Sequence, residues 1–129
     1  MATAVETHLR TSDFYFRIQL KYNDTRLPID VGNANDIRVD VINQESGEII
    51  AVKTLSQDSA TGYESIVLVD PTTDGYVDVP MNKEDFTDSA GVLVDKGMYE
   101  YVATVIEVDS NFQGGYADFQ GFGEAFILA

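Results

Sequence analysis

The sequence predicts an all-β protein, an antiparallel sandwich of seven or eight short strands with one short helical turn. Three observations carry this prediction. Residues 97–108 form the longest run of β-branched and aromatic residues, with turn-forming residues at both ends. Residues 13–20 alternate apolar and polar side chains with a period of two, which is typical of a strand with one buried face. Clusters of Asn, Asp, Gly and Pro separate short segments of this kind along the chain.

The composition fits one globular domain with an acidic surface. The chain has 129 residues, which is enough to bury an independent core. Eight basic and 22 acidic residues give a formal net charge of −14. This charge argues against binding to nucleic acid or to an anionic membrane, since both need cationic contacts. The sequence has no cysteine, which excludes thiol chemistry and cysteine-ligated metals.

The sequence carries no targeting signal that we recognise. No apolar run approaches the length of a membrane span, and the N-terminus lacks the pattern of a secretory signal. We therefore expect the protein to act where it is made, or to be carried out by another component.

The N-terminal part of the chain divides into an arm and a strand. Residues 1–12 are polar and weakly patterned, so we expect an N-terminal arm followed by a single domain at 13–129. The side chains of the first strand (13–20) expected to face the core are Phe14, Phe16, Ile18 and Leu20. Residues 22–36 form a loop rich in turn residues. Its apolar side chains, expected to cover the end of the core, are Leu27, Ile29 and Val31.

The remaining elements are short segments. Strands are expected at residues 37–42, 48–53, 63–69 and 76–79, the last ended by Pro80. Residues 81–88 are the only expected helical turn, with Phe86 as its inward anchor. The strand at 97–108 is apolar on both faces, so we expect it in the middle of a sheet and covered on both sides. A hairpin loop at 109–115 leads to the closing segment at 116–129. Its core candidates are Phe119, Phe122, Phe126, Ile127 and Leu128.

The spacing of these elements favours a sandwich of immunoglobulin type, with a jelly roll or a small barrel as the alternatives.

The sequence gives little support for a catalytic site. The only histidine, His8, is in the expected arm, so a Ser–His–Asp site would depend on the least rigid part of the chain. Carboxylates are too numerous for one pair, such as Glu84 and Asp85, to indicate acid–base catalysis. We therefore expect no enzymatic activity and no cofactor. The glycines that resemble parts of phosphate-binding loops precede no helix and fit hairpin and bulge positions instead; they are Gly114, Gly115, Gly121 and Gly123.

The segment 70–78 is the candidate metal site. Counting Asp70 as position 1 of a calcium loop places Asp74 at position 5 and Asp78 at position 9. Thr72 and Met81 depart from the pattern at positions 3 and 12, and strands flank the segment in place of helices. Asp70, Asp74 and Asp78 are the candidate ligands, but a plain turn between two strands explains the same residues, and we prefer that interpretation.

Several aromatic residues suggest a different binding site. An aromatic platform for a sugar would use Tyr99, Tyr101, Phe112 and Tyr116. The same side chains also suit a core.

Both ends of the chain resemble a known family. Residues 13–20 resemble the opening strand of the immunoglobulin-like N-terminal domain of phage baseplate upper proteins, which anchors fibres and receptor-binding proteins to a tailed phage. Residues 27–30 and 37–41 resemble the loop and the strand that come next in that domain. Residues 96–103 resemble the family's late Gly-x-Tyr strand, and residues 121–128 its closing strand. In two respects the chain departs from the family: it stops at Ala129, where the family continues into a fibre or oligomerisation region, and its loops at 56–62 and 81–88 are longer.

The resemblance implies a non-enzymatic structural protein of a tailed-phage virion, made in the host cytoplasm. It would decorate the capsid or anchor a fibre or baseplate component through protein–protein docking. The expected partners are other virion proteins in an oligomer or larger assembly, with no nucleic acid and no membrane. Residues 1–12 are the expected contact region, and the candidate contact residues are Val5, His8, Leu9, Arg10, Tyr116 and Phe122. The alternative is a glycan- or host-surface-binding module that works through exposed tyrosines.

Overall fold

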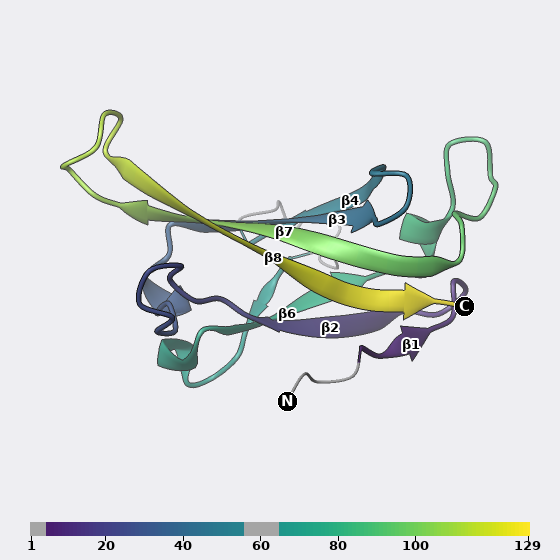
Figure 1. The fold of residues 1–129 in the computed structure, drawn as a ribbon, viewed down its shortest axis with the longest axis horizontal. Coiled ribbons are helices and arrows are strands. Elements are labelled where there is room, and N and C mark those ends of the chain that lie inside the picture. The colour runs from purple at the N-terminus through teal and green to yellow at the C-terminus, as the bar shows by residue number, and fades with distance from the viewer. Residues whose placement is uncertain (1–4, 56–64) are drawn as a thin grey trace.

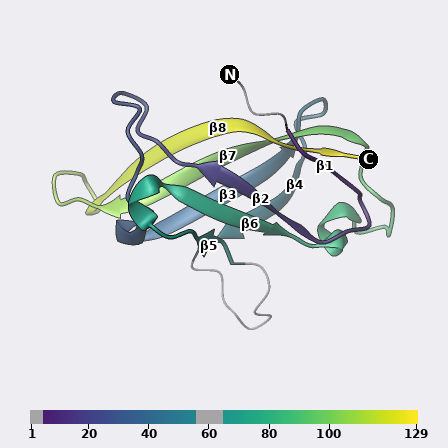
Figure 2. The same ribbon diagram turned by 90° about the horizontal axis from the view of Figure 1, so that it is seen from below.

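The protein is all-β in a computed structural model that describes residues 5–55 and 65–129 (Figure 1). The strands are β1 (Thr7–His8), β2 (Phe14–Gln19), β3 (Asp36–Asn43), β4 (Ile49–Thr54), β5 (Val67–Leu68), β6 (Tyr76–Met81), β7 (Gly97–Val108) and β8 (Tyr116–Leu128). They form one sheet in the order β1-β8-β7-β3-β4 and a second in the order β2-β6-β5. Figure 2 shows β2 and β6 as a layer lying over the strands of the larger sheet.

The described helical segments are short 3₁₀ turns. They are η1 (Val31–Asn33), η2 (Thr72–Asp74) and η3 (Lys83–Phe86). The helical turn expected at 81–88 is therefore confirmed in position but is shorter, and Phe86 is fully buried as predicted. Within the described ranges, none of these segments has the length and apolar character that a membrane-crossing helix needs.

Strand β7 lies in the middle of the larger sheet, as predicted. It pairs with β3 on one side and with β8 on the other. The prediction that both of its faces are covered is wrong. Tyr99, Ala103 and Val105 are buried against the smaller sheet, whereas Val102 and Ile106 on the opposite face remain half-exposed.

The smaller sheet corrects two strand predictions. Strand β6 continues through Pro80 to Met81 instead of ending before it. Proline is tolerated here because β5 pairs with β6 only at Val77 and Asp78, so within the described residues no ladder on that side requires a donor from position 80. The strand expected at 63–69 is reduced to Val67–Leu68, and residues 63 and 64, like the loop at 56–62, lie outside the described ranges.

The expected arm contains a strand. β1 pairs in parallel with β8, with Thr7 opposite Ile127 and His8 opposite Leu128. The sandwich is therefore not purely antiparallel. Residues 13–129 alone would leave this end of β8 without its neighbour.

A bulge in β8 decides which aromatic side chains reach the core. Tyr99 lies opposite Phe126 and Glu100 lies opposite Glu124, so the register shifts by one residue between them. Phe126 is buried, but beyond the bulge the alternation is reversed and Phe122 is 84% exposed. The prediction of Phe122 as a core residue is therefore wrong.

The glycines near this bulge do not form it. Gly121 and Gly123 lie in the regular ladder opposite Ala103 and Tyr101, so their assignment as bulge positions is wrong. Gly123 instead leaves room for the Tyr101 ring, because a Cβ there would lie 3.1 Å from the Tyr101 hydroxyl oxygen. The expected hairpin at 109–115 is confirmed, and Gly114 and Gly115 have φ angles of 91° and 82° in it.

The loop between β2 and β3 covers the core only in part. Ile29 and Val31 are buried as predicted, but Leu27 is 62% exposed. The Leu27 carbonyl oxygen accepts from the Tyr22 N–H at the base of a tight turn. The prediction for Leu27 is wrong.

Candidate docking surface

The outer face of the larger sheet carries a patch of exposed apolar side chains. One row across the sheet runs from Val52 through Asp40 and Val102 to Phe122. We use the name outer face for the residues of this row and its neighbours: Asp36, Arg38, Asp40, Ile42, Val52, Glu100, Val102, Thr104, Ile106, Val108, Tyr116, Asp118, Gln120, Phe122 and Glu124. Phe122 and Val108 are the most exposed apolar residues among them. Exposed apolar side chains that gather on one face are typical of an interaction site.

The charge of the outer face is negative. Its carboxylates are Asp36, Asp40, Glu100, Asp118 and Glu124. Among the residues of this face, Arg38 is the one cation, and its Nε lies 2.8 Å from Oδ1 of Asp40. A partner for this face would therefore present basic side chains around an apolar centre.

Two of the predicted contact residues lie on the outer face. Tyr116 and Phe122 are both exposed there. Val52, Val102 and Val108 are not among the predicted contacts. The period of two along residues 97–108 could have indicated Val102 and Val108, because it already separates two faces of that strand.

The predicted contacts in the N-terminal arm are largely engaged within the chain. The His8 ring stacks on Phe14 with centroids 3.8 Å apart, and its Nε2 lies 3.2 Å from a carboxylate oxygen of Glu6. Arg10 donates from Nη1 to the carbonyl oxygen of Val94 at 2.8 Å. Val5 is half-buried, whereas Leu9 is exposed. Among the four predicted contacts in the arm, Leu9 is thus the one best placed to meet another protein.

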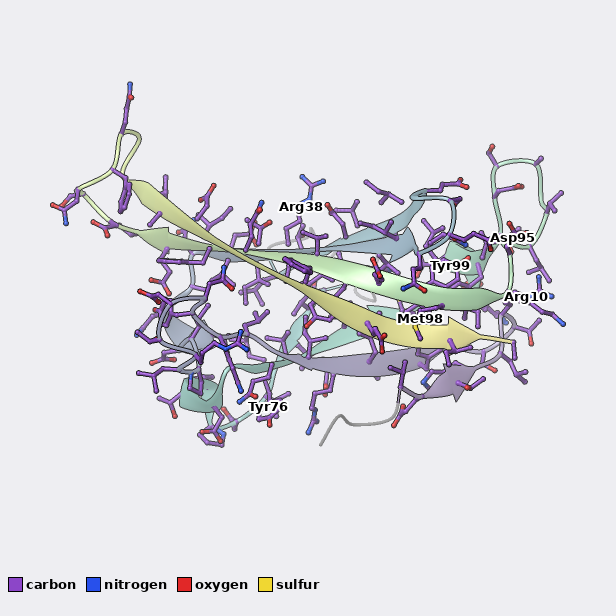
Figure 3. The ribbon with its side chains drawn as sticks, in the orientation of Figure 1. Arg10, Arg38, Tyr76, Asp95, Met98 and Tyr99 are labelled. Atoms are coloured by element: carbon purple, nitrogen blue, oxygen red, sulfur yellow. The ribbon has the colours of Figure 1, made fainter. Side chains whose placement is uncertain are left out.

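The structure does not bring together the four aromatic residues of the possible sugar platform. Tyr99 is fully buried, donates from its hydroxyl to the Asp95 carbonyl oxygen at 2.8 Å, and accepts from Asn43 Nδ2 at 3.1 Å. Figure 3 shows Tyr99 and Asp95 at the same end of the sandwich. Phe112 and Tyr116 are exposed at the far hairpin, which Figure 1 shows projecting beyond the other strands.

The structure does not bring the candidate metal ligands together. Asp74 lies in η2, Asp78 lies in β6, and Asp70 precedes both. The two carboxylate oxygens of Asp78 accept from Nε and Nη2 of Arg17 at 2.8 and 3.1 Å. In the part of the chain that the structure describes, no group of three or more His, Cys, Asp or Glu residues is arranged to hold a metal ion.

Of the two neighbouring carboxylates Glu84 and Asp85, Asp85 has a structural role. Asp85 Oδ2 accepts from Nζ of the buried Lys53 and from the backbone N–H of Asn82, both at 2.8 Å. These bonds join β4 to η3.

Three tyrosines have raised pKa values, which makes the stability of the fold depend on pH in the alkaline range. Burial raises the pKa of Tyr101. Burial also raises the pKa of Tyr99, against a smaller opposing effect of the bond from Asn43, and it raises the pKa of Tyr22, whose hydroxyl donates to Glu107. A tyrosine with a raised pKa contributes stability that is present below its unfolded pKa of about 10 and is lost as pH rises through the folded pKa.

We therefore expect the free energy of unfolding to fall as pH rises above about 10. Urea unfolding at each pH, followed by circular dichroism, measures this change. The variant Tyr101→Phe should show a smaller loss over the same range. An unchanged free energy of unfolding in the native protein would contradict the expectation.

No protein-family model, no curated protein and no solved structure matches this chain.

Proposed function

We propose that this chain is a non-enzymatic structural protein of a tailed-phage particle, with an immunoglobulin-like sandwich that docks on other virion proteins. The observation that carries the proposal is the outer face, where exposed apolar side chains are surrounded by carboxylates on a continuous sheet. A rigid sheet with such a face is suited to holding another protein in a fixed orientation. The resemblance of residues 13–20, 96–103 and 121–128 to the phage baseplate domain supplies the virion context.

The strand order supports the immunoglobulin-like assignment. Naming β2 to β8 as strands B, C, C′, D, E, F and G gives one sheet with the order B-E-D and another with the order G-F-C-C′. The pairings B-E-D and G-F-C-C′ also occur in an immunoglobulin sandwich with an added C′ strand, although here β1 joins β8 and not the smaller sheet. The bond from the Tyr99 hydroxyl to the Asp95 carbonyl is also of the kind found in the tyrosine corner at the start of strand F.

An assembly experiment tests the proposal. Purified protein is added to phage particles that lack it, and the bound copies are counted by gel densitometry. We expect Phe122→Ala to lower the bound fraction at least about tenfold, because a single exposed aromatic side chain often supplies a large share of the affinity of an interface.

Tyr15→Ala is the matched control. Tyr15 is 60% exposed on β2, in the other sheet, so its loss should leave binding unchanged. Equal binding of Phe122→Ala and the native protein would exclude the outer face as the docking site.

The second candidate function is a glycan- or host-surface-binding module. It is favoured only by Phe112 and Tyr116, which are both exposed near the hairpin tip. Selective binding on a glycan array that is lost in Tyr116→Ala and retained in Phe122→Ala would support this alternative against the first.

A further inference from the structure

One edge of the larger sheet is covered over only a few residues. β8 runs from Tyr116 to Leu128, but β1 pairs with it only at Ile127 and Leu128. There Ile127 donates its N–H to the Glu6 carbonyl, and Ala129 donates to the His8 carbonyl. In the described ranges no other strand pairs with β8 on this side.

One hydrogen bond shows which backbone N–H and C=O groups of β8 point away from the sheet. The side chain of Asn23 donates to the carbonyl oxygen of Gln120 at 2.9 Å from the loop beside the edge. Alternate residues of a strand direct their backbone N–H and C=O to the same side. The backbone groups of Phe122 and Glu124 therefore also face outward, between Asn23 at one end and β1 at the other.

A groove lies beside this edge. β2 is the edge strand of the smaller sheet, so the sandwich is open between β2 and β8. A cavity of about 300 Å³ there is lined by apolar side chains that include Leu20, Ile29, Tyr101 and Phe119. The space beside Gly121 is open, because a Cβ built at this position would meet nothing within 4 Å. An added strand would thus find both backbone partners and an apolar surface for every second side chain.

The two ends of the groove differ in charge. Lys21 and Arg26 lie at the end near Gln120, and neither forms an ion pair within the described residues. Toward β1, Glu124 lines a second cavity together with Glu6, Asp78 and Arg17, and Arg17 is paired with Asp78. A second copy of the chain is a poor occupant, because each copy carries a net charge of −14.

We propose that the edge of β8 at Phe122 and Glu124 accepts an extended segment of a partner virion protein as an additional antiparallel strand. The segment has apolar residues at alternate positions, a basic residue near its start beside Glu124, and an acidic residue near its end beside Lys21 and Arg26. The six residues between Gln120 and Ile127 span roughly 20 Å at about 3.3 Å per residue, which suits a segment of about six residues. The proposal rests on the docking function above and names a second contact for it.

A designed peptide tests the strand addition. The probe is acetyl-Lys-Val-Thr-Val-Thr-Asp-amide, and its binding is measured by chemical-shift changes of backbone amides on titration. We expect saturable chemical-shift changes centred on β8. Two control peptides, one with Lys and Asp exchanged and one N-methylated at alternate residues, should each bind at least about tenfold more weakly. N-methylation removes the backbone donors and leaves the side chains in place.

Two substitutions of Phe122 distinguish binding at the backbone edge of β8 from binding through the side chains of the outer face. Phe122→Pro removes the outward N–H, and proline is compatible with an edge strand, so we expect peptide binding to weaken at least about tenfold. Phe122→Ala keeps the N–H, so it should change peptide binding by less than about threefold while still reducing docking on particles. Circular dichroism checks that each variant is folded. If Phe122→Pro does not fold, the N-methylated peptide tests the same backbone hydrogen bonds on the native protein.

Three results would overturn the proposal. They are absence of peptide binding at millimolar concentration, equal binding of the N-methylated peptide, and tighter peptide binding after deletion of residues 1–4. The last result would assign the edge to the protein's own N-terminus. Each is distinct from failure of the docking function, which is decided by particle binding of Phe122→Ala.

Discussion

Replacing Phe126 with alanine is expected to lower the free energy of unfolding by about 4 kcal/mol. Phe126 is fully buried and joins both sheets. Its ring lies edge-on to Phe14 and Phe16 of β2, with centroids 5.0 and 5.3 Å away, and stacks on Tyr99 of β7 at 5.5 Å. Alanine would leave a cavity among rings that cannot close on it without moving one sheet. Urea unfolding followed by circular dichroism measures the loss.

Phe122→Ala is the matched control for this experiment. It removes the same side chain from the same strand, but Phe122 is exposed on the outer face. We expect its effect on the free energy of unfolding to stay within about 0.5 kcal/mol. Comparable losses for the two variants would contradict the positions that the bulge gives to these side chains.

Replacing Asp85 with alanine is expected to lower the free energy of unfolding by about 3 kcal/mol. Lys53 is 1% exposed, and its ammonium lies 2.8 Å from Asp85 Oδ2. Without Asp85 the buried charge has lost its partner, and such a charge destabilises more than the intact pair stabilises. The loss of the bond to the Asn82 N–H adds to the effect.

A double-mutant cycle separates the two contributions. In Lys53→Met with Asp85→Ala the buried position carries no charge, so we expect the double variant to be more stable than Asp85→Ala alone. Thermal unfolding of the native protein, both single variants and the double variant gives the coupling. A double variant less stable than Asp85→Ala would show that the charge at Lys53 is not the source of the loss.

The candidate docking surface is predictable from the sequence only in part. Tyr116 and Phe122 are contact candidates on the sequence alone, and both are exposed. Phe122 is also a core candidate, and the pattern alone cannot decide between these alternatives. Counting back from Phe126 with a period of two places Phe122 on the buried face. The bulge reverses this assignment, and its position depends on the pairing with Tyr99 and Glu100 in β7.

Several functional predictions fail because they depend on neighbours distant in sequence. Asp78 has the spacing of a cation ligand, but Arg17, on the adjacent strand, binds its carboxylate. Tyr99 is an aromatic residue suited to a sugar, but it lies under Phe126 and donates to the Asp95 carbonyl. Lys53 falls at the end of a predicted strand, and nothing local indicates that its ammonium is buried against η3.

The sequence pattern alone predicts most of the extended segments and, in regular strands, most of the side chains that face inward. The alternation along residues 13–20 predicted the buried Phe16, Ile18 and Leu20, because the side-chain period of a strand is a local property of the backbone. Three features emerge only from the packing of the strands: β1 joins β8, Pro80 lies within a strand, and Phe122 faces solvent. These features depend on which strand pairs with which and in what register. Strands that pair are far apart in the sequence, so the local pattern of apolar and polar residues does not reveal the pairing.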